Sequence, residues 1–256
     1  ELIWLTLKRQ ISNTLEREYL NELATQTLLL QESDKLYKTL FNSISHELRI
    51  PVATILTASE TLSTIGNDMI KEINNEIYTA GKRLHRLIEE LISMSRVASG
   101  RLSPRCEYYD IQDLIGPVLQ QMKIELSDYK LNIDIEEDTP LINMDLVLMQ
   151  QILTNLLYNI INYVPKHSQI NIKTHYENSL FSMEVSDNGP GFNEEDLPHI
   201  FDKFYRGAHV PTGGSGLGLA IVKGYAEAMK GTATACNIPG ACITITIPSE
   251  ILIIKE

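Results

Sequence analysis

Asparagines at regular intervals are the first residues whose type and spacing could do chemistry. In NLLYNIINY, residues 155–163, Asn155, Asn159 and Asn162 recur every three or four positions, which places them on one face of a helix. Amide oxygens suit a magnesium ion that also carries waters and phosphate groups. Taken alone, the stretch fits a polar stripe on a half-buried helix better than a metal site.

Two glycine-rich stretches could bind a nucleotide. In DNGPGF, residues 187–192, Asp187 could accept a hydrogen bond from an exocyclic amine, and the glycines permit close backbone approach. In GGSGLGLAIVKG, residues 213–224, a loop runs into a helix, where backbone N–H groups bind anions. Between them, IFDKFYRG carries Lys203 and Arg206, which are either solvated or phosphate contacts. Each stretch alone is a weak signal, and no preceding strand supports a dinucleotide site.

One histidine has an acidic neighbour and lies about one turn before a proline that should bend the helix. His46 stands in ISHELRIP, before Glu47, and Pro51 should kink the helix one turn later. A neutral imidazole is a nucleophile near pH 7, and the next carboxylate could take its proton. For the other histidines we expect structural or solvated roles: His85, His167, His175, His199 and His209.

The elements that must position these residues fall into two regions. The first hundred residues read as two long helices with apolar residues at heptad spacing, which predicts an antiparallel hairpin. One hairpin leaves apolar surface uncovered, so we expect a four-helix bundle in a homodimer. After SGRLSPR, residues 99–105, strands and helices alternate, which predicts an α+β fold with helices on one face of a mixed sheet. The expected strands are 106–111, 131–137, 169–176, 180–188, 231–237 and 241–248, and the expected helices are 110–127, 145–163 and 216–229.

Composition excludes several classes of function. The net charge of -11 disfavours non-specific binding to nucleic acid or anionic lipid. Three cysteines without metal or disulfide spacing favour a reducing compartment. The apolar run LIWLTL near the start is too short to cross a bilayer.

The order of the motifs resembles the sensor histidine kinases of two-component systems over roughly residues 33 to 250. SISHELRIP resembles their phosphoacceptor (HisKA) helix, and the later stretches resemble their ATP-binding (HATPase_c) domain, an α/β sandwich of the Bergerat/GHKL type. SDKLYKTLFNSISHELR and IFDKFYRG look most like the KdpD potassium-sensor kinases. The resemblance implies a signalling helix at 1–32 from a missing sensory domain, a dimerisation and phosphotransfer domain at 33–102, and a catalytic domain at 103–256. It also implies the cytoplasmic portion of a protein anchored in the bacterial inner membrane, with membrane contact only through missing upstream segments.

The resemblance implies a protein-histidine kinase that uses ATP to phosphorylate His46 and passes the phosphoryl group to an aspartate of a response regulator. Glu47 would orient the imidazole and take its proton, and Asn159 would bind Mg²⁺. The implied nucleotide contacts are Asn155, Tyr163 against the adenine, Asp187 on its amino group, Gly189, Gly191, Lys203, Arg206 at the γ-phosphate, Gly214, Gly216, Leu217 and Gly218.

Two residues depart from the family pattern. Asn162 stands where a phosphate-contacting lysine is usual, and Ile50 stands where a threonine or asparagine supports dephosphorylation of the regulator. Ile50 cannot hydrogen-bond through its side chain, so phosphatase activity is in doubt. These departures leave two alternatives open, a degenerate kinase that acts as a dimeric scaffold and a conformational ATPase of the same superfamily.

Overall fold

The computed structural model describes most of the chain after residue 66. The described residues are 67–98, 102–136, 139–207 and 214–250, preceded by Trp4, Arg17, Glu47, Leu48, 50–55, 57, 58 and 61. His46 and much of the first predicted helix lie outside them. The boundary expected at residues 102 and 103 falls between helix α2 (Asn67–Ala98) and strand β1 (Glu107–Tyr109), and it stays a prediction.

Helix α2 has the heptad pattern expected of the second helix of a hairpin. Ile73, Ala80, Leu87 and Met94 are buried at intervals of seven residues. Ile88 and Ile92, one turn apart, are each 43% exposed although they are large and apolar. Part of this helix therefore presents apolar surface to solvent. Among the described helices, α2 included, none combines the length and apolar character that a membrane crossing requires.

A five-stranded mixed sheet forms the centre of the rest of the molecule. Its strands are β2 (Lys130–Ile135), β4 (Gln169–Glu177), β5 (Leu180–Asp187), β6 (Thr232–Asn237) and β7 (Ala241–Pro248), in the spatial order β2-β4-β5-β7-β6. Only β2 and β4 pair in parallel, and the other pairs are antiparallel. Strand β6 is therefore an edge strand, which leaves one side of its backbone without a partner strand in this sheet.

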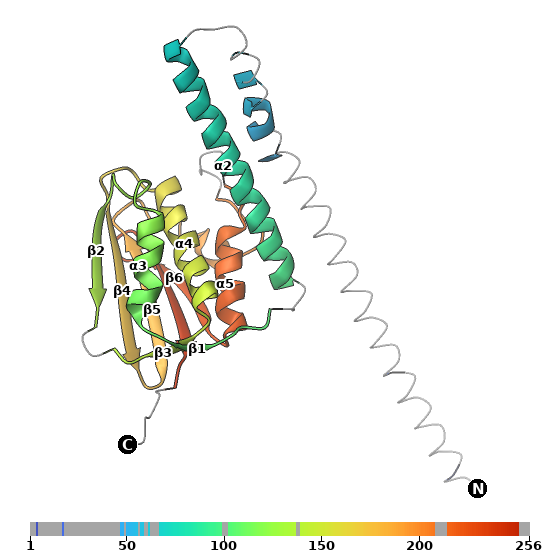
Figure 1. Cartoon of the computed structure of the whole chain (residues 1–256). Coiled ribbons are helices and arrows are strands. Elements are labelled where there is room, and N and C mark those ends of the chain that lie inside the picture. The colour runs from blue at the N-terminus through green and yellow to red at the C-terminus, as the bar shows by residue number, and fades with distance from the viewer. Residues whose placement is uncertain are drawn as a thin grey trace.

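Three helices cover one face of this sheet, as the sequence predicts. They are α3 (Ile111–Gln121), α4 (Leu146–Tyr163) and α5 (Gly218–Ala228), and α2 runs alongside α5 on the outer side (Figure 1). Alternate strand residues point toward these helices. Ile170, Ile172, Phe181, Met183, Ile245 and Ile247 are all at most 1% exposed. The layer between this sheet face and the helices is the main core, and its packing fixes the positions of α4 and α5 on the sheet.

Two local features differ from the predicted elements. A short strand, β3 (Ile142–Met144), pairs with β1 and was not expected, because three residues are too few to show an alternating pattern. Helix α3 ends at Gln121 rather than near residue 127. Met122 and Leu126 are both buried and four residues apart, so turns after α3 keep the helical spacing that extended the prediction.

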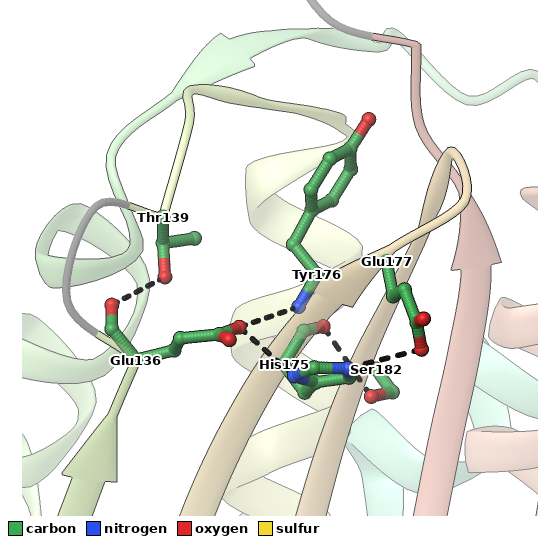
Figure 2. Close-up of polar contacts among 6 residues, drawn as sticks. All are labelled: Glu136, Thr139, His175, Tyr176, Glu177 and Ser182. Atoms are coloured by element: carbon green, nitrogen blue, oxygen red, sulfur yellow. Dashed lines mark hydrogen bonds and ion pairs between the residues drawn. The ribbon is translucent and has the colours of Figure 1, made fainter.

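A polar network lies where strand β2 ends beside β4, and it continues their pairing beyond Ile135, the last residue of β2 (Figure 2). The Glu136 carboxylate accepts a hydrogen bond from the Tyr176 backbone N–H at 3.1 Å and lies 2.9 Å from Nδ1 of His175. Nε2 of the same ring lies 3.5 Å from the Glu177 carboxylate. His175 is thus an exposed residue whose ring nitrogens contact two carboxylates, one from each side.

Candidate functional site

Helix α4 presents its asparagine face to the start of α5. The Asp145 carboxylate caps α4 by accepting from the Leu148 backbone N–H at 3.0 Å, and buried leucines and isoleucines hold the opposite face in the core. A Cβ at Gly218 would lie 3.5 Å from Oδ1 of Asn159 and 3.9 Å from Oδ1 of Asn155. Both amide oxygens therefore lie near the start of α5, whose first residue has no side chain.

The glycine-rich loop approaches its neighbours more closely than other residues would allow. A Cβ at Gly214 would overlap the Tyr163 hydroxyl. Gly216 has φ +70°, and its Cβ would lie 2.8 Å from the backbone of Phe204 and of Tyr205. The Gly216 carbonyl accepts from the Phe204 N–H at 2.9 Å, which ties the loop to the segment that carries Arg206.

Asp187 ends β5 in a buried position. Its side chain is 2% exposed and accepts hydrogen bonds from the backbone N–H groups of Gly189, at 2.7 Å, and of Ala241. Burial raises the pKa of this carboxyl above its ordinary value, and the two N–H donors oppose that rise. A Cβ at Gly189 would lie 2.8 Å from the Val164 side chain, so the turn packs directly on the end of α4.

The hairpin between β6 and β7 supports the turn after Asp187. The Asn237 side chain accepts from the Phe192 N–H and donates to the Phe192 carbonyl, both at 2.8 Å. A Cβ at Gly240 would lie 2.7 Å from Oδ1 of Asp187 and 2.8 Å from the Gly189 nitrogen. Residues 237–241 thus form a rigid backing for the predicted adenine pocket.

One ion-pair cluster joins the two regions of the chain. The Glu47 carboxylate is buried between two guanidinium groups, Nη2 of Arg83 at 3.2 Å and Nη1 of Arg206 at 3.5 Å. Arg83 lies on α2, and Arg206 follows the F-x-x-F segment. The residue that follows His46 in sequence is therefore in contact with the cation predicted to meet the γ-phosphate.

A second polar contact joins α2 to the glycine-rich loop. The buried Glu90 carboxylate accepts from the Ser215 hydroxyl and pairs with Nε of Arg86 at 2.9 Å. The Arg86 guanidinium also lies over the Tyr158 ring of α4, 4.2 Å from its centroid, which is a cation–π contact. Between the two polar contacts, Leu48, Leu87 and Leu91 line a narrow crevice against the loop.

The predicted residues fall into two groups in the structure. The first group lies where α4 meets the start of α5 and comprises Asn155, Asn159, Tyr163, Gly214, Gly216, Leu217 and Gly218. The second group forms the adjacent turn against Val164 and comprises Asp187, Gly189 and Gly191. Lys203 and Asn162 are exposed. Sequence reasoning missed the interdomain residues Arg83, Arg86, Glu90 and Ser215. The i, i+4 spacing of Arg86 and Glu90 on α2 is visible in the sequence, but it does not show that the pair contacts the loop that carries Ser215.

Both regions match known domain families. Residues 37–100 match the His Kinase A (phospho-acceptor) domain. Residues 144–251 match the family of histidine kinase-, DNA gyrase B-, and HSP90-like ATPases. Asn155, Asn159, Asp187 and the glycine-rich loop all lie within the second match, so the site described above belongs to an ATPase domain.

Relatives match nearly the whole chain. The sensor protein KdpD of Clostridium acetobutylicum is 32% identical over 255 residues, which is 96% of this chain and 28% of that protein. The sensor protein KdpD of Escherichia coli K12 is 33% identical over 94% of this chain and 27% of its own length. The chain thus spans just over a quarter of these relatives. A solved histidine kinase ThkA, in complex with the response regulator protein TrrA, has the same fold, with a TM-score of 0.66 and 18% identity over 83% of this chain and 61% of that one.

Proposed function

We propose, because this chain belongs to the sensor histidine kinases, that it uses ATP to phosphorylate His46 and then passes the phosphoryl group to an aspartate of a response regulator. The contact between Glu47 and Arg206 is the observation that carries this proposal. This contact supports the proposal because Arg206, the expected γ-phosphate contact, lies 3.5 Å from the residue that follows the expected acceptor. Phosphoryl transfer depends mainly on positioning and charge neutralisation, and this arrangement supplies both.

The nucleotide would lie across the junction of α4 and α5. Asp187 would accept a hydrogen bond from the adenine amino group, since its carboxylate is buried and fixed by two backbone donors. The N–H groups at the start of α5 would hold the phosphates near Gly216 and Gly218. Asn155 and Asn159 fit a magnesium ion, because their amide oxygens both lie near Gly218, which has no side chain to obstruct an ion. Asn159 would hold that ion, which neutralises phosphate charge when bound.

Glu47 would accept the imidazole proton during attack. Arg83 and Arg206 hold its carboxylate from two sides, which fixes the side chain of the residue that follows the proposed acceptor. The regulator would dock on the helical bundle below His46, and a response regulator as partner is supported by the complex in which a similar kinase was solved. The exposed Ile88 and Ile92 on α2 support a homodimer. We also propose membrane anchoring through an upstream region, which the similarity to the KdpD sensor proteins implies.

Labelling with γ-phosphate-labelled ATP tests the kinase proposal. The parent should acquire acid-labile, base-stable phosphate, His46→Gln should acquire none, and Glu47→Gln should label more slowly. His85→Gln is the matched control, because His85 is an exposed helical histidine on α2 and should not affect labelling. Adding a candidate regulator should move the label onto that protein. Equal labelling of the parent and His46→Gln would refute the proposal.

A further inference from the structure

Two cysteines face each other across the β6–β7 hairpin. Cys236 of β6 and Cys242 of β7 are directly opposed in the antiparallel ladder, their side chains are in hydrogen-bonding contact, and both are free thiols. Opposed residues in such a ladder have Cα atoms about 4.5–5.5 Å apart. A disulfide requires a Cα separation of about 4.4–6.8 Å. The backbone of the reduced protein is therefore already placed for a bond between the two sulfurs.

The two thiols differ in access. Cys242 is 2% exposed, whereas Cys236 is half-buried on the edge strand of the sheet. Burial, and then the nearby Glu184 carboxylate, raise the pKa of Cys242 to about 12. An oxidant from solution should therefore react first at Cys236, and Cys242 should complete the bond. Cys106 lies just before β1, which belongs to the separate two-stranded sheet, and it is exposed.

The cysteine pair adjoins the backing of the predicted adenine pocket. Asn237, which follows Cys236, holds the Phe192 backbone through two hydrogen bonds of 2.8 Å. Ala241, which precedes Cys242, donates its backbone N–H to the Asp187 carboxylate. Joining the two sulfurs would thus fix the hairpin at the residues next to both contacts. The sulfurs must move from hydrogen-bonding contact to a bond of about 2.05 Å, and that movement would be transmitted through Ala241 to Asp187 and through Asn237 to the turn at Phe192.

We propose that Cys236 and Cys242 form a reversible intramolecular disulfide that weakens nucleotide binding at the adjacent pocket. The oxidant is a low-molecular-weight disulfide of the glutathione class. The Cys236 thiolate attacks one sulfur of the oxidant, forms a mixed disulfide and releases one thiolate, which takes up a proton. Cys242 then gives up its proton and attacks the Cys236 sulfur, which releases the second thiol. Two S–H bonds become one S–S bond, and the oxidant is reduced to two thiols.

The formation of the disulfide does not depend on the proposed function, but its effect on nucleotide binding does. The experiment uses the full chain with Cys106→Ser, so that the opposed pair is the only source of thiols. After incubation with oxidised glutathione, this protein should lose both thiols, retain no glutathione and lose two hydrogens in intact mass. In the same background, Cys236→Ser should retain one thiol or carry one glutathione. Stable glutathione adducts on the pair, or two persisting thiols, would overturn the disulfide.

Nucleotide binding is then measured on the reduced and oxidised forms. Oxidation should raise the dissociation constant for Mg·ATP about tenfold, the effect of displacing one buried hydrogen-bonding partner, and dithiothreitol should reverse it. Cys242→Ala, which cannot form the bond, should bind equally well before and after oxidation. Unchanged affinity in an oxidised protein of confirmed mass would overturn the control of binding. Absence of Mg·ATP binding in the reduced protein would instead refute the proposed function, while the thiol count would still decide the disulfide.

Discussion

Alanine at Gly214 would place a methyl group where the Tyr163 hydroxyl now lies. The next nearest atom among the described residues, Cζ of Tyr163, is 3.5 Å from that Cβ, which is an ordinary contact, so within the described part of the chain the hydroxyl alone obstructs it. Overpacking of this kind costs about 1–3 kcal/mol. Tyr163 is 38% exposed and its ring can move aside, which places the overpacking cost at the low end of this range, about 1 kcal/mol. We expect Gly214→Ala to weaken Mg·ATP binding about fivefold, measured by calorimetry.

Removing the obstructing atom supplies the decisive comparison. Tyr163→Phe deletes the hydroxyl, so the double variant with Gly214→Ala should bind Mg·ATP within about twofold of Tyr163→Phe alone. Gly216→Ala is the matched control. It has φ +70° and would meet backbone atoms of Phe204 and Tyr205, so Tyr163→Phe should not rescue it. Parent-like binding by Gly214→Ala, or no rescue by Tyr163→Phe, would refute the reasoning.

Four further predictions follow from single contacts. Burial raises the pKa of Asp187, so its buried charge costs stability near neutral pH, and that cost is relieved as pH falls through the raised pKa toward 3.8. Asp187→Asn should flatten the pH dependence of the unfolding free energy in urea titrations across that window, and an unchanged slope would contradict the assignment. Glu90→Gln and Ser215→Ala should show a coupling of about 1.5 kcal/mol in a double-mutant cycle of stability, whereas strict additivity would exclude their hydrogen bond in solution. Lysine at the exposed position 162 should tighten Mg·ATP binding about threefold at low salt, whereas Asn162→Gln should not. Ile50→Thr, at a position 39% exposed, should accelerate dephosphorylation of the regulator while Ile50→Val does not, and equal rates would show that this position does not limit phosphatase activity.

Local periodicity predicted the elements that build the ATPase domain. The alternating pattern of β4 and β5 and the apolar repeat of α4 come from burial against one layer, and each can be read within a short segment. The same repeat placed Asn155 and Asn159 on one face of α4. Strand β3 was not predicted from the sequence, because it is short and is stabilised by pairing with β1, which lies more than thirty residues earlier.

The contacts between the two regions could not be predicted in this way. Glu90 and Ser215 are 125 residues apart, and their hydrogen bond depends on how α2 packs beside α5. Nothing in the sequence near Ser215 distinguishes it from an ordinary loop serine. The burial of Glu47 between Arg83 and Arg206 also depends on that packing. Family resemblance supplied expected roles for Glu47 and Arg206 individually, but not the contact between them.

The ion pair of Glu47 with Arg206 has a consequence for the order of events in the reaction. A guanidinium that neutralises a carboxylate is partly satisfied before any phosphate arrives, so the two anions compete for one cation. If Arg206 meets the terminal phosphate as proposed, nucleotide entry would displace Glu47 from it and leave the carboxylate paired with Arg83, which would make it a stronger base. Glu47 would then become available as the base only when the phosphoryl donor is in place. While the nucleotide site is empty, Glu47 would be less able to take a proton from the histidine.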